Sequence, residues 1–109
     1  MTLSAYKGMW LIVMFDLPVD SNRKRKIYAN FRKQLLSNGF VMLQYSIYAR
    51  YCASEDASKT YRNYIKSIIP DEGEVRLLAV TDCQFGKMEV FCGKKRKLPE
   101  KTPVQLELF

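Results

Sequence analysis

Histidine is absent from this sequence of 109 residues. Its absence excludes catalysis by Ser-His-Asp or Cys-His groups. It also removes the histidine acid and base pairs that metal-free ribonucleases often use. If the chain acts on phosphodiesters, a divalent metal held by carboxylates is the simplest remaining route.

Cysteines and long apolar segments are also scarce. Cys52, Cys83 and Cys92 form no CxxC pair, so structural zinc is not expected. The longest apolar run, Met9–Phe15, is far shorter than the ~20 residues that span a bilayer. It also lacks the basic leader and small-residue cleavage site of a signal peptide. We therefore expect a cytoplasmic protein with no membrane partner.

Acidic residues are in deficit. The chain has 18 Lys and Arg against 11 Asp and Glu, a formal net charge of +7. A basic excess of this kind favours polyanionic partners, with nucleic acid first among them. The length suits one domain with a single core.

The hydrophobic pattern predicts strands alternating with two helices. The first helix is capped by Asp20, Ser21 or Asn22 and ends near Ser37, and the second begins after Ser54. Residues 82–86 are expected to form a loop. The segment 40–51 is long for one strand and is expected to break or bend near 44–46, as one bent strand or as two. The predicted strand regions are 10–15, 40–51, 74–81 and 87–92.

This order of elements predicts an α+β fold, a ferredoxin-like βαββαβ sandwich with an extra C-terminal strand. Both helices would pack on one face of an antiparallel sheet. The strands are so apolar that the other face should also be covered, most simply by a second copy of the chain in a homodimer. We place this domain at residues 1–92 and a tail at residues 93–109.

The tail begins with a basic run, Lys94–Lys97, and ends in a segment that alternates like a strand. One interpretation is a solvated terminus, as most termini are. The other, which we favour slightly, is a segment that docks on a partner protein. Its docking side chains would be Val104, Leu106, Leu108 and Phe109.

Asp16 ends the first apolar strand. A carboxylate buried there would be unfavourable without a partner. It could accept backbone N–H groups in the turn that follows, bind a metal ion, or do both. Asp20 and Asp82 are weaker candidates for metal ligands. Ser46 is not expected to be a nucleophile, because no histidine can activate it.

Four consecutive cations, Arg23–Lys26, stand at the start of the first helix. Positive charge there opposes the helix dipole, whose positive end lies at the N-terminus. Phosphate groups would offset this cost, so we predict contacts to a nucleic-acid backbone, which position it without reading its sequence. The predicted interface continues through Arg32, Lys33 and Lys87.

Three segments together resemble a known family: FDLP at 15–18, RKRKIYANFRKQLLSNGF at 23–40 and MLQYSIYAR at 42–50. They resemble the CRISPR-associated protein 2 family, the small subunit of the spacer-acquisition machinery, and look most like its type II branch. The similarity extends over nearly the whole chain, and the order of elements agrees.

The resemblance implies a two-fold dimer in which the two copies of Asp16 face each other and bind one Mg²⁺ or Mn²⁺ ion. It implies a dimer that holds prespacer duplex DNA and bridges two dimers of the integrase subunit, with the C-terminal segment docked on that subunit. Some members of the family are metal-dependent endonucleases on RNA or DNA, so a stand-alone nuclease is the alternative. An RNA-binding ferredoxin-like module is a third, less favoured alternative.

Overall fold

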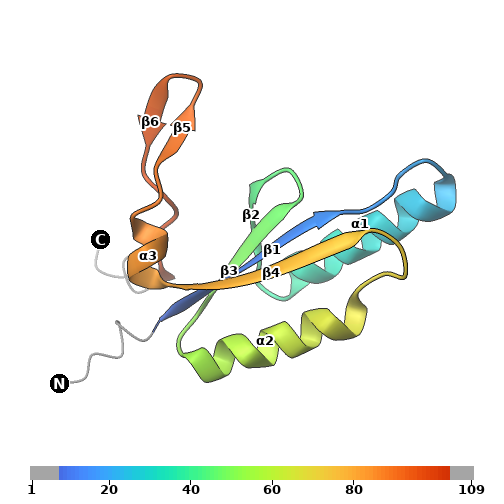
Figure 1. The fold of residues 1–109 in the computed structure, drawn as a ribbon, viewed down its shortest axis with the longest axis horizontal. Helices are drawn as coiled ribbons and strands as arrows, with labels where there is room; N and C mark the ends of the chain where they lie inside the picture. Colours follow the sequence, from blue (N-terminus) through green and yellow to red (C-terminus); the bar gives the residue numbers. More distant parts are fainter. Residues whose placement is uncertain (1–7, 104–109) are drawn as a thin grey trace.

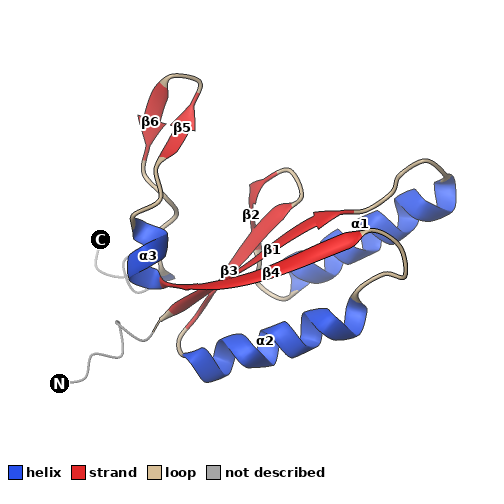
Figure 2. Cartoon of the chain, viewed as in Figure 1, coloured by secondary structure: helices blue, strands red, loops and turns tan. Residues whose placement is uncertain are grey.

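The computed structural model describes residues 8–103, in which two long helices lie on one face of a four-stranded antiparallel sheet (Figure 1). The strand order β2-β3-β1-β4 is that of a ferredoxin-like fold, as the sequence predicts. Figure 2 shows a two-stranded hairpin, β5–β6, standing apart from this sheet. The strands are β1 (Met9–Asp16), β2 (Val41–Gln44), β3 (Ile47–Cys52), β4 (Glu74–Thr81), β5 (Val90–Cys92) and β6 (Lys95–Lys97), and the helices are α1 (Asn22–Ser37), α2 (Glu55–Ile68) and α3 (Asp82–Gly86).

Both long helices begin where the sequence predicts. The hydroxyl of Ser21 accepts the N–H of Lys24 at 3.1 Å, and that of Ser54 accepts the N–H of Ala57 at 3.0 Å. Each bond satisfies one of the four N–H groups that a helix start leaves without a partner. Helix α1 ends at Ser37, and Gly39 follows with a φ of 83°, a conformation that favours glycine.

The long strand-prone segment is two strands rather than one. Strands β2 and β3 pair antiparallel across a tight turn at Tyr45 and Ser46. Ser46 has a φ of 64°, which is uncommon for a residue other than glycine. Its hydroxyl lies 3.0 Å from that of Tyr28 on α1, so the turn is tied to the helix layer.

Strand β1 lies between β3 and β4 and divides its side chains between two environments. Leu11, Val13 and Phe15 point to the helices and are buried in the main core, with Phe31 and Leu35 of α1. Fully burying side chains of this size contributes about 1.5–3 kcal/mol each. The alternate residues of β1, which include Asp16, point to the opposite face.

The predicted loop at 82–86 is wrong, because these residues form α3. Thr81 and Gln84 cap each other: the Thr81 hydroxyl accepts the Gln84 N–H, and the Gln84 side chain accepts the Thr81 N–H. Helix α3 lays Phe85 on Trp10, with ring centroids 4.1 Å apart and nearly parallel planes. One end of the sheet's second face is therefore covered by the chain itself.

The last predicted strand is shorter than expected. Residues 87–89 are not a strand, and only Val90–Cys92 are, paired with Lys95–Lys97. After the hairpin the chain returns to the body of the protein, where Thr102 is buried. The docking side chains predicted in the tail, at 104–109, lie outside the described residues. No helix in the part of the chain described is long and apolar enough to cross a membrane.

Candidate metal centre and nucleic-acid interface

Asp16 is the last residue of β1 and its side chain is exposed. Because β1 alternates, Asp16 lies on the sheet face that α1 and α2 leave uncovered. The carboxylate therefore does not bear the desolvation penalty that a buried strand end would impose. Among residues 8–103 it accepts no hydrogen bond, so the turn-capping role considered for it is absent from the described structure.

Asp16 borders a hollow of about 290 Å³ at the end of the sheet. The Ser46 turn closes one side of it, since the Phe15 N–H donates to the Ser46 carbonyl at 3.1 Å. The other side is the start of β4. The lining residues are Met14, Phe15, Asp16, Tyr45, Ser46, Ile47, Glu74 and Arg76.

Two charged residues of this hollow are not apparent from the sequence. Glu74 is the register partner of Asp16 across β1 and β4, so both carboxylates lie on the same face. The Arg76 guanidinium donates two hydrogen bonds to one oxygen of Glu74, at 2.9 and 3.1 Å. Arg76 thus partly balances two neighbouring negative charges. Finding this trio from the sequence requires knowing that β1 and β4 pair antiparallel.

The weaker candidate ligands have other roles. Asp82 accepts the indole N–H of Trp10 at 3.0 Å and so fixes α3 to the sheet. Asp20 pairs with Lys24 at 3.1 Å, four residues along the chain. This hydrogen bond lowers the pKa of Asp20 and raises the pKa of Lys24.

The donor set at Asp16 suits magnesium only in part. Within residues 8–103, no group of three or more metal-ligating side chains is assembled. Magnesium keeps several waters and needs only one or two carboxylates from the protein. Asp16 and Glu74 supply two carboxylates within one chain, which meets that smaller requirement. A second chain facing this surface would supply two more.

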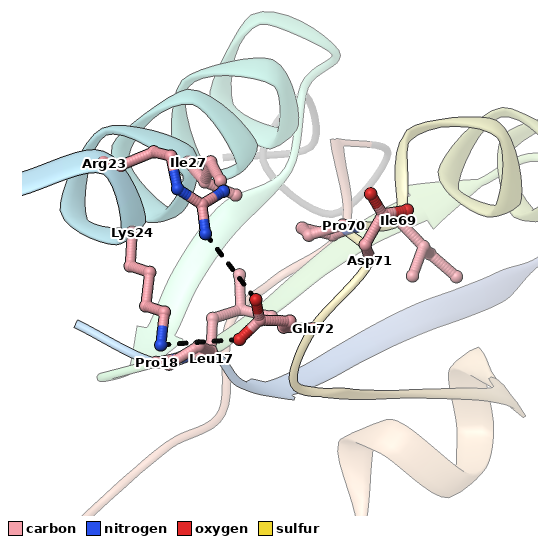
Figure 3. A pocket seen from close by; sticks show the side chains of 9 residues that line it. All are labelled: Leu17, Pro18, Arg23, Lys24, Ile27, Ile69, Pro70, Asp71 and Glu72. Atoms are coloured by element: carbon pink, nitrogen blue, oxygen red, sulfur yellow. Dashed lines mark ion pairs between the residues drawn. The ribbon is translucent and has the colours of Figure 1, made fainter. Parts of the chain in front are cut away.

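The basic start of α1 is less available than the sequence suggests. Figure 3 shows Arg23 and Lys24 reaching to Glu72 in the loop before β4, with distances of 3.6 and 3.5 Å. Lys24 also pairs with Asp20. The Arg25 guanidinium donates to the Val19 carbonyl and to the Asn22 side chain.

Other α1 cations predicted to contact phosphate have no carboxylate partner in the described chain. Lys26 and Lys33 are exposed and have no ion pair within the described chain. Arg32 is exposed as a residue, but its Nε donates to the Tyr48 hydroxyl at 2.7 Å. The exposed α1 cations without an ion pair in the described chain are therefore Arg25, Lys26, Arg32 and Lys33, of which Arg25 and Arg32 bond to neutral groups.

Within one chain, Lys87 lies apart from the cations of α1. It follows α3, whereas the N-terminus of α1 lies at the opposite end of the sheet (Figure 1). The seven predicted basic residues thus fall into two groups. In the described structure none of the seven lines the hollow at Asp16, where the cation is Arg76.

Fold, exposed strand-end carboxylate and basic helix together define a small basic protein with a ferredoxin-like fold. A family model described as CRISPR associated protein Cas2 matches residues 9–88, most of the chain. The chain belongs to this family, as its resemblance predicts.

Similar proteins cover nearly the full length of the chain. A protein of Parvibaculum lavamentivorans is 50% identical over 101 residues, which is 93% of this chain and 100% of that protein. A protein of Flavobacterium psychrophilum is 44% identical, over 98% of this chain and 93% of its own length. A third, of Paracidovorax avenae, is 38% identical over 98% of this chain and 99% of its own. All three are named CRISPR-associated endoribonuclease Cas2.

Proposed function

We propose that this chain acts as a homodimer in CRISPR spacer acquisition, where it binds prespacer duplex DNA and bridges integrase subunits. The observation that carries the proposal is the second face of the sheet. There an exposed carboxylate, Asp16, lies at the end of an apolar surface that α1 and α2 do not cover. Membership in the Cas2 family supports this role.

The apolar surface favours a second copy of the chain as its cover. Ile12 and Met14 of β1 are only partly buried, and Leu78 of β4 is 48% exposed. Leu78 is the register partner of Ile12, so the two form one continuous patch. Two copies packed through this patch would bring their Asp16 side chains to one interface.

In such a dimer, Asp16 would hold Mg²⁺ or Mn²⁺ with Glu74 as a second carboxylate. A metal of this kind, when bound, supplies charge stabilisation and an activated water for phosphodiester hydrolysis. The residues of the chain would position it: Arg76 holds Glu74, and the Ser46 turn shapes the hollow's other wall.

The second candidate function is metal-dependent cleavage of RNA or DNA as the protein's own activity. The names of its relatives favour it, since they are called endoribonucleases. The third candidate, base stacking on the sheet, has less support. Trp10 on that face is 3% exposed beneath Phe85, so it offers no free ring.

Asp16→Asn, tested in two assays, separates the first two functions. One assay measures cleavage of RNA and DNA by the purified protein with Mg²⁺ and with chelator. The other measures spacer acquisition in cells that carry the cognate integrase. We expect cleavage to be lost and acquisition to persist. Loss of both by a folded dimer would contradict the bridging role and favour the nuclease.

A deletion of residues 104–109 tests the tail separately. It should abolish integrase binding and leave dimerisation intact. Persistent binding would contradict the docking role of Val104, Leu106, Leu108 and Phe109. Assignment to the type II branch stays a prediction.

A further inference from the structure

The turn at Ser46 holds the end of the strand that carries Asp16. The register between β1 and β3 ends at Met14, which is paired with Ile47. One residue beyond it, the Phe15 N–H donates to the Ser46 carbonyl at 3.1 Å. Asp16 follows Phe15 directly. On the β3 side of the sheet, the position of the Asp16 backbone therefore depends on the Ser46 turn.

The backbone of Ser46 needs support from outside the turn. Its φ of 64° lies in a region that residues other than glycine seldom occupy. Such conformations persist only where the surrounding structure holds them, and they gather at functional sites. Tyr45, the other residue of the turn, is 83% exposed and gives it little packing. The hydroxyl of Tyr28, 3.0 Å from that of Ser46, supplies a hold from the helix layer.

Tyr28 contacts both sides of this strand end. Its ring packs on the main core, with its centroid 5.7 Å from that of the Phe15 ring. Its hydroxyl reaches the Ser46 side chain. One side chain of α1 therefore fixes the residue before Asp16 and also the turn to which that residue donates its N–H.

Other hydroxyl bonds already join the helices to their surroundings. The Arg32 Nε donates to the Tyr48 hydroxyl at 2.7 Å, and the Tyr64 hydroxyl donates to the Gln34 side chain at 3.0 Å. None of these four residues lines the hollow at Asp16 in the described structure. The bond of Tyr28 differs from them, because its partner Ser46 is part of the wall of that hollow.

We propose that Tyr28 is a positioning residue for the metal centre at Asp16, and that it acts through the hydroxyl of Ser46. This inference rests on the proposed function, in which Asp16 holds Mg²⁺ or Mn²⁺. Partners that orient a metal ligand without contacting the metal typically contribute 10–100-fold in affinity. The contribution matters here because the site has few ligands, so the placement of each one weighs heavily in binding.

The test compares Tyr28→Phe with a matched control, Tyr64→Phe, in the full chain. Each variant removes one tyrosine hydroxyl that is bonded at 3.0 Å, and each keeps the ring. Mn²⁺ affinity is measured by isothermal titration calorimetry, and stability by urea unfolding. Both variants should lower the urea midpoint, but only Tyr28→Phe should weaken Mn²⁺ binding, by about 10-fold. A hydroxyl with a merely structural role would change the midpoint and leave the affinity unaltered.

A second variant, Ser46→Ala, removes the other hydroxyl of the pair. It should weaken Mn²⁺ binding as much as Tyr28→Phe does. The double variant should lose no more than either single variant, because the two residues act through one hydrogen bond. Losses that add in the double variant would overturn the role of Ser46 as the link.

Asp16→Asn separates this inference from the proposed function. If Asp16→Asn abolishes Mn²⁺ binding and Tyr28→Phe leaves it unchanged, the positioning role is overturned and the metal centre stands. Equal losses of affinity in Tyr28→Phe and Tyr64→Phe would overturn the role as a general loosening of the helix layer. If the unaltered protein binds no Mn²⁺, or if Asp16→Asn binds it equally well, the metal centre and the positioning role both fail.

Discussion

Asp16 and Glu74 are register partners at the end of β1 and the start of β4, and their carboxylates share one face of the sheet. Like charges directly opposite each other in a sheet are destabilising. Arg76, 2.9 Å from Glu74, offsets part of the repulsion. A bound cation would offset the rest, which makes this pair the most informative place to alter the proposed metal centre.

Asp16→Asn should abolish Mn²⁺ binding, and Glu74→Gln should weaken it about 10–100-fold if its carboxylate supports the ion. Isothermal titration calorimetry on the purified protein measures both affinities. Asp56→Asn, on the exposed first turn of α2, is the control. Binding unchanged by Asp16→Asn would remove Asp16 as a ligand, and binding unchanged by Glu74→Gln would confine the site to Asp16.

Leu78→Asp should convert a dimer into a monomer. Leu78 is 48% exposed in the single chain, so a carboxylate is tolerated there until a second copy covers it. Burying an unpaired charge at an interface is strongly unfavourable. Light scattering after size exclusion should give twice the 12.7 kDa chain mass for the unaltered protein and the single mass for the variant. Val19→Asp changes an equally exposed residue outside this face and should stay dimeric.

Gly73→Ala should destabilise the fold by about 1–3 kcal/mol. Gly73 has a φ of 97°, and an added Cβ would lie 2.7 Å from the Asp16 carbonyl and 2.8 Å from the Leu17 side chain. This close approach sets the loop that carries Glu72 and begins β4. Urea unfolding measures the change. Gly86→Ala is the control, because nothing lies within 4 Å of its added Cβ. Equal stability of the two variants would contradict the strain argument.

Glu72→Gln should strengthen duplex DNA binding about 2–5-fold, since it frees Arg23 and Lys24 from their exposed ion pairs with Glu72. The neighbouring change Asp71→Asn lines the same pocket but breaks no ion pair of the described chain. Anisotropy at low salt compares them. If both variants gain equally, only net charge is acting. If neither gains, the start of α1 does not contact DNA.

The features that the sequence predicts well depend on neighbours along the chain. Ser21 and Ser54 cap their helices through residues three positions away, so both helix starts were predictable. Helix α3 depends on an equally local signal, the Thr81 and Gln84 pair, so its start is also encoded by neighbours along the chain. The residues near Asp16 that the sequence does not predict, Glu74 and Arg76, have no such local signal. Glu74 and Arg76 reach Asp16 only because β4 pairs with β1 across more than fifty residues, and no local pattern encodes that register.

The same limit applies to the charges of α1. The run Arg23–Lys26 was visible in the sequence, but its pairing with Glu72 was not. Glu72 approaches α1 because α2 and β4 return the chain to the end of β1. Composition therefore identified a basic protein, and the tertiary structure showed which cations are available.

Cys52 provides a pH-dependent test of the core. It is 2% exposed, and burial raises the pKa of its thiol above the ordinary value of 9.0, with Arg50 opposing the shift. The folded state therefore keeps a proton that the unfolded state releases. The contribution of the protonated Cys52 thiol to the stability of the fold is complete below pH 9.0 and is lost as pH rises above that value. Burial also raises the pKa of Tyr51, which adds a loss in the same direction above its ordinary value of 10.0.

The urea midpoint should accordingly fall between pH 8 and pH 10, and Cys52→Ala, although less stable at every pH, should show a flatter decline. Thiol alkylation gives an independent measurement: Cys83 and Cys92 are exposed and should react in the native protein, whereas Cys52 should react only after unfolding. Cys83→Ala serves as the control for the pH slope, which it should leave unchanged. A decline equally steep in Cys52→Ala, or rapid alkylation of native Cys52, would show that this thiol is not held in the core.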